Sequence, residues 1–209
     1  MFAMAPRHAA AQKLAQGKVP RNIGRAIALG RMTAFEKPNS KVRGIVTGDS
    51  LRRLVAKTLA QQFGEEIEQA CAPFQFALST RAGTDCVGHA LRAITDENPE
   101  MIIESLDGIG AYDHIDRSVM LGELLKLQGA SAMLPFILLF YGQQSKYLWR
   151  DENDNVFTIL QGDGGDQGDP SMPALFALGL NPALPMGKEK LQQGEQLLAF
   201  LDDVYVEVT

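Results

Sequence analysis

The chain has 209 residues, of which 45% are hydrophobic and 22% charged, a composition that excludes disordered and fibrous classes. Two cysteines and three histidines favour neither a disulfide framework nor a zinc site, so we expect a reducing compartment inside the cell. Apolar runs stay shorter than the roughly 18 residues that span a bilayer, so we expect no membrane association.

The net charge of −5 is unevenly distributed along the chain. Residues 1–60 hold twelve Lys and Arg against two acids, or +10, whereas the remainder holds eight against 23, or −15. This asymmetry suggests a basic surface for a polyanion and an acidic region that holds cations. A basic tail beside a solvated acidic surface is the alternative, and charge alone does not separate the two.

The basic N-terminal extension, residues 1–30, contains no acid. A mitochondrial transit peptide has a similar composition, but glycines and a proline interrupt any long amphipathic helix here. No compact apolar segment indicates a secretory signal. We therefore expect an intracellular protein without a secretory signal; the sequence specifies neither its compartment nor whether the basic segment is a targeting peptide.

The next segment predicts two short strands and a helix. Residues 33–35 and 42–47 are predicted strands around a turn at 37–40. Asp49 or Ser50 caps a helix that we expect to end at Gly64. The basic residues of this helix are placed mostly outside its apolar stripe: Arg52, Arg53 and Lys57.

The rest of the chain alternates helices and strands without a regular repeat. Predicted helices cover about 84–94, 117–128, 132–141 and 170–180, with a loop or short helix at 182–194. Predicted strands cover 101–106, 196–201 and 204–208, and 146–149 with 156–160 form a hairpin. This mixed order indicates an α+β fold with a largely antiparallel sheet packed on helices.

Three segments carry residues suited to chemistry. The predicted strand at 101–106 ends at Asp107. After Asp107 come a Gly-containing turn, Tyr112 and a second Asp. The turn between the last two strands holds Asp202 and Asp203; carboxylates ~4 Å apart repel by about 4 kcal/mol at an effective dielectric of 20, unless a cation offsets the repulsion. The alternatives are a cap for the first Asp and a solvated turn for the pair.

The third segment is the Gly- and Asp-rich loop 162–169, which leads into Pro170 and an apolar helix. Such a loop can bring its backbone close to a nucleotide or base pair. A calcium loop is the alternative, but the spacing of the acids does not match an EF-hand.

In this order the three segments resemble the palm motifs of reverse transcriptases. Residues 107–113 resemble the Asp-x-x-x-Ala-aromatic-Asp motif, 167–170 the Gln-Gly-Asp-Pro motif, and 200–203 the aromatic-x-Asp-Asp motif. Upstream, 41–45 and 51–57 resemble the fingers of non-LTR retrotransposon enzymes, and 73–89 their connecting segment. The resemblance covers roughly residues 30–209.

The resemblance implies a fingers-like segment at 31–100 and a palm at 101–209. The Asp-Asp motif stands close to residue 209, so we expect a truncated palm and no thumb. The implied function is an RNA-directed DNA polymerase that uses an RNA template, a DNA primer and deoxynucleoside triphosphates. The main alternative is a catalytically inactive remnant that binds nucleic acid through its basic first 60 residues; a calcium-binding protein is a distant third.

The resemblance also implies roles for individual residues. Asp107, Asp202 and Asp203 would bind two Mg²⁺ or Mn²⁺ ions. The expected nucleotide-binding residues are Arg43 and Lys41 at the triphosphate, Tyr112 as a steric gate against ribose, and Gln167 with Gly168 beside the incoming nucleotide. The expected template-phosphate contacts are Arg52, Arg53 and Lys57.

Overall fold

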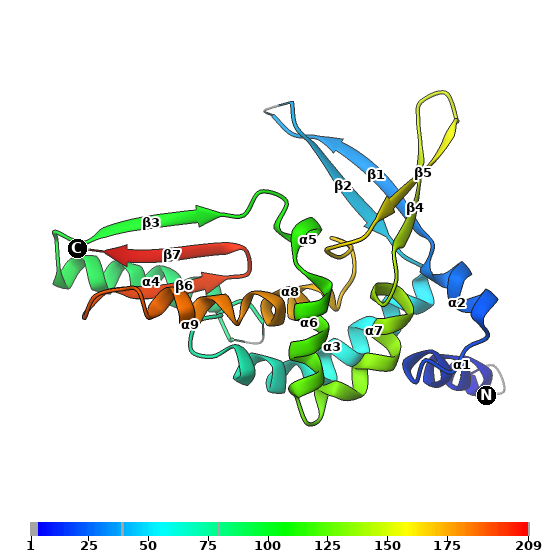
Figure 1. Cartoon of the computed structure of the whole chain (residues 1–209), viewed down its shortest axis with the longest axis horizontal. Helices are drawn as coiled ribbons and strands as arrows, with labels where there is room; N and C mark the ends of the chain where they lie inside the picture. Colours follow the sequence, from blue (N-terminus) through cyan, green and yellow to red (C-terminus); the bar gives the residue numbers. More distant parts are fainter. Residues whose placement is uncertain (1–3, 39, 79, 209) are drawn as a thin grey trace.

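The computed structural model describes residues 4–38, 40–78 and 80–208, and its strands form two separate sheets around a helical body (Figure 1). The first sheet has the order β2-β1-β4-β5, with β1 Gly30–Glu36, β2 Val42–Thr47, β4 Ser145–Arg150 and β5 Val156–Gln161. The second has the order β3-β7-β6, with β3 Ile102–Asp107, β6 Gln196–Phe200 and β7 Asp203–Val208. The helices are α1 Met4–Ala15, α2 Arg21–Ala28, α3 Ser50–Cys71, α4 Gly83–Glu97, α5 Ala111–His114, α6 Arg117–Lys126, α7 Leu134–Tyr141, α8 Met172–Leu180 and α9 Ala183–Lys188, with a 3-10 turn at Ala130–Met133.

The four-stranded sheet joins segments that lie far apart in the sequence. The strand β1 pairs antiparallel with β2 and parallel with β4, so that Arg31 is opposite both Thr47 and Leu148. The predicted hairpin is β4–β5, which therefore completes the sheet that β1 and β2 begin. The parallel pair was not predicted, because a long crossover connects its strands and leaves no local sequence signal.

The three-stranded sheet is antiparallel throughout and is extended by a short piece of the connecting segment. Gln75 forms a bridge with Ala199 of β6. The Phe76 amide donates a hydrogen bond to the Ala199 carbonyl over 2.9 Å, and the Ala199 amide donates to the Phe74 carbonyl over 2.8 Å. Residues 74–76 thus cover the β6 edge that would otherwise expose unpaired backbone groups.

The helices share one hydrophobic core with α3 running through it. Asp49 caps α3, as predicted, by accepting hydrogen bonds from two amides of its first turn. The predicted end at Gly64 is wrong, because α3 continues for two more turns that bury Ile67 and Cys71 completely. Burial of that apolar surface outweighs the roughly 1 kcal/mol that an interior glycine costs a helix.

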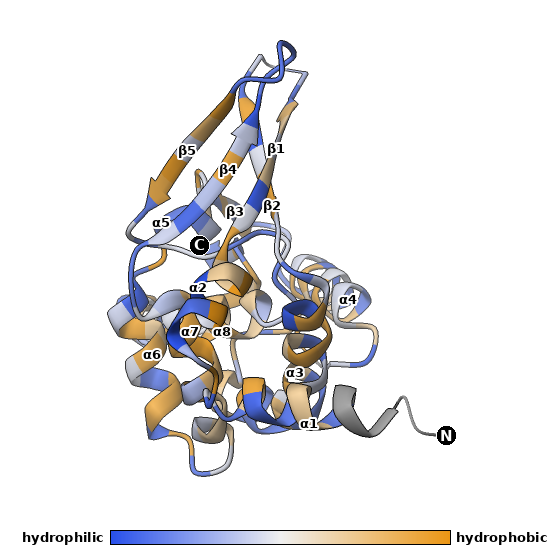
Figure 2. Ribbon diagram, turned by 90° about the vertical axis from the view of Figure 1, so that its right-hand side faces the viewer, coloured by the Kyte–Doolittle hydropathy of each residue, from blue (hydrophilic) through white to orange (hydrophobic). Residues whose placement is uncertain are grey.

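The predicted α+β class with a largely antiparallel, palm-like sheet packed on helices is confirmed. Figure 2 shows the four-stranded sheet projecting from the helical body, away from α1. Among the described residues, every helix is too short or too polar to cross a bilayer. Of the predicted turn at 37–40, Asn39 lies outside the described residues.

Candidate active site

The end of β3 meets the turn between β6 and β7. Asp107 and Asp203 are opposite each other as the last pair of the β3–β7 ladder, so their side chains leave the same face of the sheet. Phe200 pairs with Asp203, which leaves Leu201 and Asp202 as a two-residue turn. The antiparallel register therefore brings the three predicted acids to one end of this sheet.

The three acids influence one another electrostatically. The pKa of the Asp203 carboxyl lies above its ordinary value because of partial desolvation and because of the negative charges of Asp202 and Asp107. In the part of the chain that the structure describes, no three Asp, Glu, His or Cys side chains form a preassembled metal-chelating cluster. The hard oxygen donors and their mutual repulsion fit a divalent cation, which would offset the repulsion.

A buried glutamine from the connecting segment anchors the acidic turn. Leu201 has a left-handed backbone with a φ of 54°, a conformation that costs a non-glycine residue about 1 kcal/mol. Its amide donates a hydrogen bond to Oε1 of Gln75 over 2.7 Å. Sequence reasoning missed Gln75, although a polar residue between Phe74 and Phe76 was a detectable sign of a buried hydrogen bond.

A cavity of about 500 Å³ opens beside these acids and receives residues from both sheets. It collects most of the residues that the sequence assigned to metal and nucleotide: Lys41, Arg43, Asp107, Tyr112, Gln167 and Asp202. Lys37 and Asp113 also line it, and Asp203 lies next to it opposite Asp107. Basic groups from the β1–β2 hairpin thus stand across the cavity from acids of the three-stranded sheet.

Tyr112 forms one wall of this cavity. Its ring stacks on Phe176 of α8, with ring centroids 4.9 Å apart and an interplanar angle of 21°. Desolvation and the negative charge of Asp202 raise the pKa of the Tyr112 hydroxyl to about 12. The residue therefore presents a neutral, fixed ring to the cavity at neutral pH.

Positive charge reaches the same cavity from β2. Burial raises the pKa of the Asp113 carboxyl, and the charges of His114 and Arg43 partly oppose that rise. Arg43 is therefore close enough to the palm acids to act on an anion bound between them. A planar guanidinium is suited to phosphate oxygens, which is consistent with the expected triphosphate contact.

Arg52 does not contact solvent or ligand, and the expectation that it binds template phosphates is wrong. Only 2% of Arg52 is exposed, and its Nη2 lies 2.6 Å from Asp169 and 2.9 Å from Asp166. Its guanidinium also lies over the Phe140 ring, 4.1 Å from the centroid. Burial alone would lower the pKa of Arg52, but the surrounding tyrosine and carboxylates outweigh that effect and raise it.

Arg117, a second buried arginine that sequence reasoning missed, holds the loop 162–169 from the other side. Its Nε donates to the Gly164 carbonyl over 2.7 Å, and its Nη2 donates to Oγ of Ser145 over 2.8 Å. The Tyr147 hydroxyl donates to Asp166 over 2.5 Å. Since the two buried aspartates already have protein partners, the loop is not built as a calcium site, and it presents Gln167 to the cavity.

Gly168 is required for a backbone contact other than the expected one. A Cβ at this position would lie 2.3 Å from the carbonyl oxygen of Val46 in β2. The structure thus shows that Gly168 packs against the four-stranded sheet, and its approach to an incoming nucleotide stays a prediction. Arg53 and Lys57 are exposed on α3, as a role at nucleic-acid phosphates requires.

Comparisons with known proteins agree with this architecture. No family model and no curated protein match the sequence. Among solved structures, apo telomerase from Candida tropicalis, truncated from its C-terminal domain, has a TM-score of 0.62 at 10% identity, over 88% of this chain and 44% of that one. Telomerase from Candida albicans in complex with the TWJ fragment of telomeric RNA has a TM-score of 0.59 at 12% identity, over 91% and 39%.

An RdRp complex has a TM-score of 0.56 at 12% identity, over 98% of this chain and 20% of that one. The chain therefore spans less than half the length of each of these structures. At such low identities the likeness concerns the fold alone. The chain therefore shares the fold of telomerase reverse transcriptase and of an RdRp.

Proposed function

We propose that this chain is the fingers and palm part of an RNA-directed DNA polymerase of the non-LTR retroelement type, which transfers nucleotides to a primer under the direction of a template. One observation carries the proposal: a single cavity gathers two acids of the Asp motifs, a fixed tyrosine, the loop glutamine and basic residues of the β1–β2 hairpin. Telomerase neighbours, one of them in complex with a fragment of telomeric RNA, support RNA as a partner.

Asp107, Asp202 and Asp203 would hold two Mg²⁺ or Mn²⁺ ions, which in polymerases stabilise the attacking and leaving oxygens of an in-line displacement. Arg43 and Lys41 would bind the triphosphate across the cavity and neutralise its charge. Gln167, held by the buried loop contacts, would position the nucleotide base. Positioning and charge neutralisation would supply most of the acceleration.

Tyr112 would select the sugar of the incoming nucleotide. Stacking on Phe176 fixes the ring, and in this role the fixed ring would collide with a ribose 2′ hydroxyl. We expect Tyr112→Val to accept ribonucleotides far more readily, with little change for deoxynucleotides. Comparing kcat/KM for deoxynucleotides and ribonucleotides tests this expectation. If the ratio of the two values is the same in Tyr112→Val and the wild type, Tyr112 is not a steric gate.

The proposal is tested by primer extension on an RNA template with Mg²⁺ or Mn²⁺. Asp202→Asn should reduce extension at least ~100-fold, because it removes a carboxylate from the site where charge must be neutralised. Asp96→Asn, an exposed acid on α4, is the matched control and should behave as the wild type. Primer extension that persists in Asp202→Asn would contradict the proposed role of Asp202 as a metal ligand.

A non-catalytic nucleic-acid-binding remnant is the second candidate. It is favoured by the absence, among the described residues, of a preassembled three-acid cluster. Titration with Mn²⁺ separates the two candidates without requiring turnover. The polymerase proposal predicts Mn²⁺ binding that Asp107→Asn and Asp202→Asn each weaken, whereas the remnant binds oligonucleotide equally well in both variants and shows no such Mn²⁺ site.

A further inference from the structure

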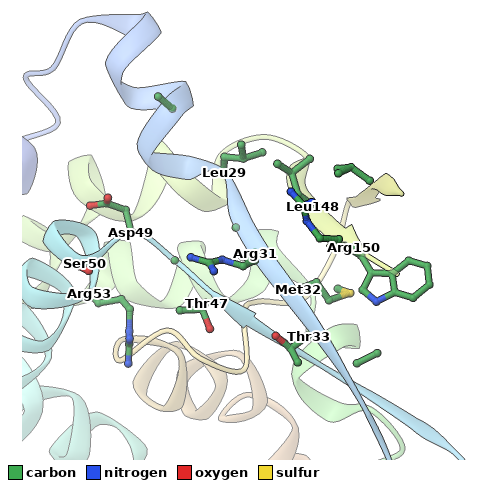
Figure 3. A pocket seen from close by; sticks show the side chains of 16 residues that line it. Leu29, Arg31, Met32, Thr33, Thr47, Asp49, Ser50, Arg53, Leu148 and Arg150 are labelled. Atoms are coloured by element: carbon green, nitrogen blue, oxygen red, sulfur yellow. The ribbon is translucent and has the colours of Figure 1, made fainter. Parts of the chain in front are cut away.

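A second cavity, of about 770 Å³, lies between the end of α2, the strands β1 and β4, and the start of α3 (Figure 3). We call it the arginine pocket, because three arginines from three elements line it: Arg31 of β1, Arg53 of α3 and Arg150 of β4. Figure 3 shows Arg31 extending from β1 toward the start of α3. This pocket is separate from the active-site cavity and contains none of the acids of the Asp motifs.

The positive charge of this pocket is poorly compensated. Arg31 and Arg53 take part in none of the ion pairs found among the described residues. Arg150 pairs over 3.1 Å with Asp154, but both side chains are largely exposed, so the pair contributes little. Asp49 also lines the pocket, yet its carboxylate accepts hydrogen bonds from the amides of Leu51 and Arg52 as the cap of α3.

The remaining polar groups of the pocket suit phosphate. The hydroxyls of Thr33, Thr47 and Ser50 line it beside the arginines. Phosphate contacts in protein–nucleic-acid complexes come mainly from arginine, lysine and hydroxyl side chains. Arginine pairs with phosphate through two parallel hydrogen bonds, which makes it the stronger and more directional donor.

A third cavity shares lining residues with the arginine pocket and with the active-site cavity. Met32, Ala34 and Trp149 line both the arginine pocket and this third cavity, of about 480 Å³. The third cavity in turn shares Asp113 and Gln167 with the active-site cavity. The three cavities are therefore neighbours, and Trp149 lines both the arginine pocket and the cavity next to the active-site cavity.

We propose that the arginine pocket binds phosphates of single-stranded nucleic acid, with Trp149 as a stacking surface for a base on the way to the active site. Aromatic rings beside arginines are the combination that binds single strands without sequence preference. This inference rests on the proposed function, since it names where the template would lie. Inorganic triphosphate offers the same anionic groups but has no base to stack on Trp149.

The test uses fluorescently labelled oligouridylate of twelve nucleotides and the whole chain. Arg31→Ala with Arg53→Ala should weaken binding by at least ~10-fold and flatten the dependence of log K on log salt by about 0.7 per lost phosphate contact. The matched control Arg92→Ala, an exposed arginine of α4, should change neither. Trp149 is the single tryptophan, so oligouridylate should quench its fluorescence in the wild type and the control but not in the double variant.

Wild-type affinity, salt dependence and quenching in a folded double variant would overturn the inference, and so would binding of inorganic triphosphate that oligouridylate does not displace. Far-UV circular dichroism verifies folding; if the double variant unfolds, Arg31→Lys and Arg53→Lys are measured for the same salt dependence. Asp202→Asn should retain oligouridylate binding. If the chain shows no polymerase activity but still needs Arg31 and Arg53 to bind oligouridylate, the proposed function is wrong and the inference about the arginine pocket stands.

Discussion

Arg52 shows how a single residue can be misassigned when neighbouring charges are read as one group. Arg52 and Arg53 are adjacent, but the buried positions in the first half of α3 are 52, 55, 56 and 59, which share one helical face. Helical spacing from the apolar positions thus places Arg52 inside and Arg53 outside. The two aspartates that pair with it come from the loop 162–169, and no local pattern links segments so far apart in the sequence.

We predict that Arg52→Met destabilises the protein by about 3–5 kcal/mol, because it leaves Asp166 and Asp169 buried without their cation. Urea unfolding followed by circular dichroism measures the loss. Adding Asp166→Asn and Asp169→Asn should recover part of it, since the uncompensated charges are then removed. The neighbour Arg53→Met is the control and should stay within about 0.5 kcal/mol of the wild type, and equal effects at the two positions would contradict the buried network.

Asp203 should show the cost of placing like charges together. Its folded-state pKa is raised, so the ionised carboxylate destabilises the fold at neutral pH, and this penalty disappears as pH falls through the raised pKa. We predict that Asp203→Asn raises Tm by about 1–2 °C at pH 7 without divalent ions, and that the gain vanishes near pH 4. Thermal unfolding across pH measures this difference.

Divalent ions should reverse the order of stability of the wild type and Asp203→Asn. Mn²⁺ stabilises only a chain that binds it, so the wild type should gain Tm with rising Mn²⁺ while Asp203→Asn gains less. The affinity of the wild type should also fall as pH decreases into the range of the raised pKa, because the protonated carboxyl is a poor ligand. A variant that is less stable than the wild type at pH 7 without metal would contradict the repulsion.

At the scale of elements, the loop 162–169 depends on glycine where it passes β2. We predict that Gly168→Ala costs about 1–3 kcal/mol, because its Cβ would lie 2.3 Å from the Val46 carbonyl oxygen. Gly162→Ala in the same loop meets no atom within 4 Å and is the matched control. Thermal unfolding of both variants measures the contrast. Equal stability of the two would mean that the loop does not pack against β2 as described.

The sequence predicted elements better than it predicted their ends and partners. The hairpin β4–β5 and the cap Asp49 were predictable, because turns and caps depend on residues a few positions apart. The end of α3 was not, since burial by distant helices decides whether a helix continues past Gly64. The short α5 was missed as well, because Gly110 starts it from a left-handed backbone rather than with a side-chain cap.

The candidate site was predictable as a set of motifs but not as a surface. Acids in two tight turns, separated by a long stretch of chain, indicated a shared metal site only through their order and their resemblance to palm motifs. The antiparallel pairing of β3 with β7 brings the acids of the two turns together, which their spacing in the sequence does not reveal. The arginine pocket had no sequence signal, because its arginines come from three elements and the parallel β1–β4 pair, which has no local pattern, brings Arg150 to the other two.

At the scale of the whole molecule, buried polar contacts join the four-stranded sheet to the helical body. Tyr147 of β4 donates to Asp166, and Arg117 of α6 bonds to Ser145 at the start of the same strand. Arg52 connects α3 to the same loop. A sheet that projects from the body would otherwise be free to open separately, so these contacts should make unfolding cooperative.

This coupling can be measured because the single tryptophan, Trp149, lies in β4 of the projecting sheet. In the wild type, urea unfolding followed by Trp149 fluorescence should coincide with unfolding followed by helical circular dichroism. Arg117→Met removes the donor to Gly164 and Ser145. We predict that its fluorescence transition moves to lower urea than its circular dichroism transition, because β4 then loses its link to α6. Exposed Lys126→Met of the same helix should leave the two transitions together, and coincident transitions in Arg117→Met would show that hydrophobic packing alone couples the sheet to the body.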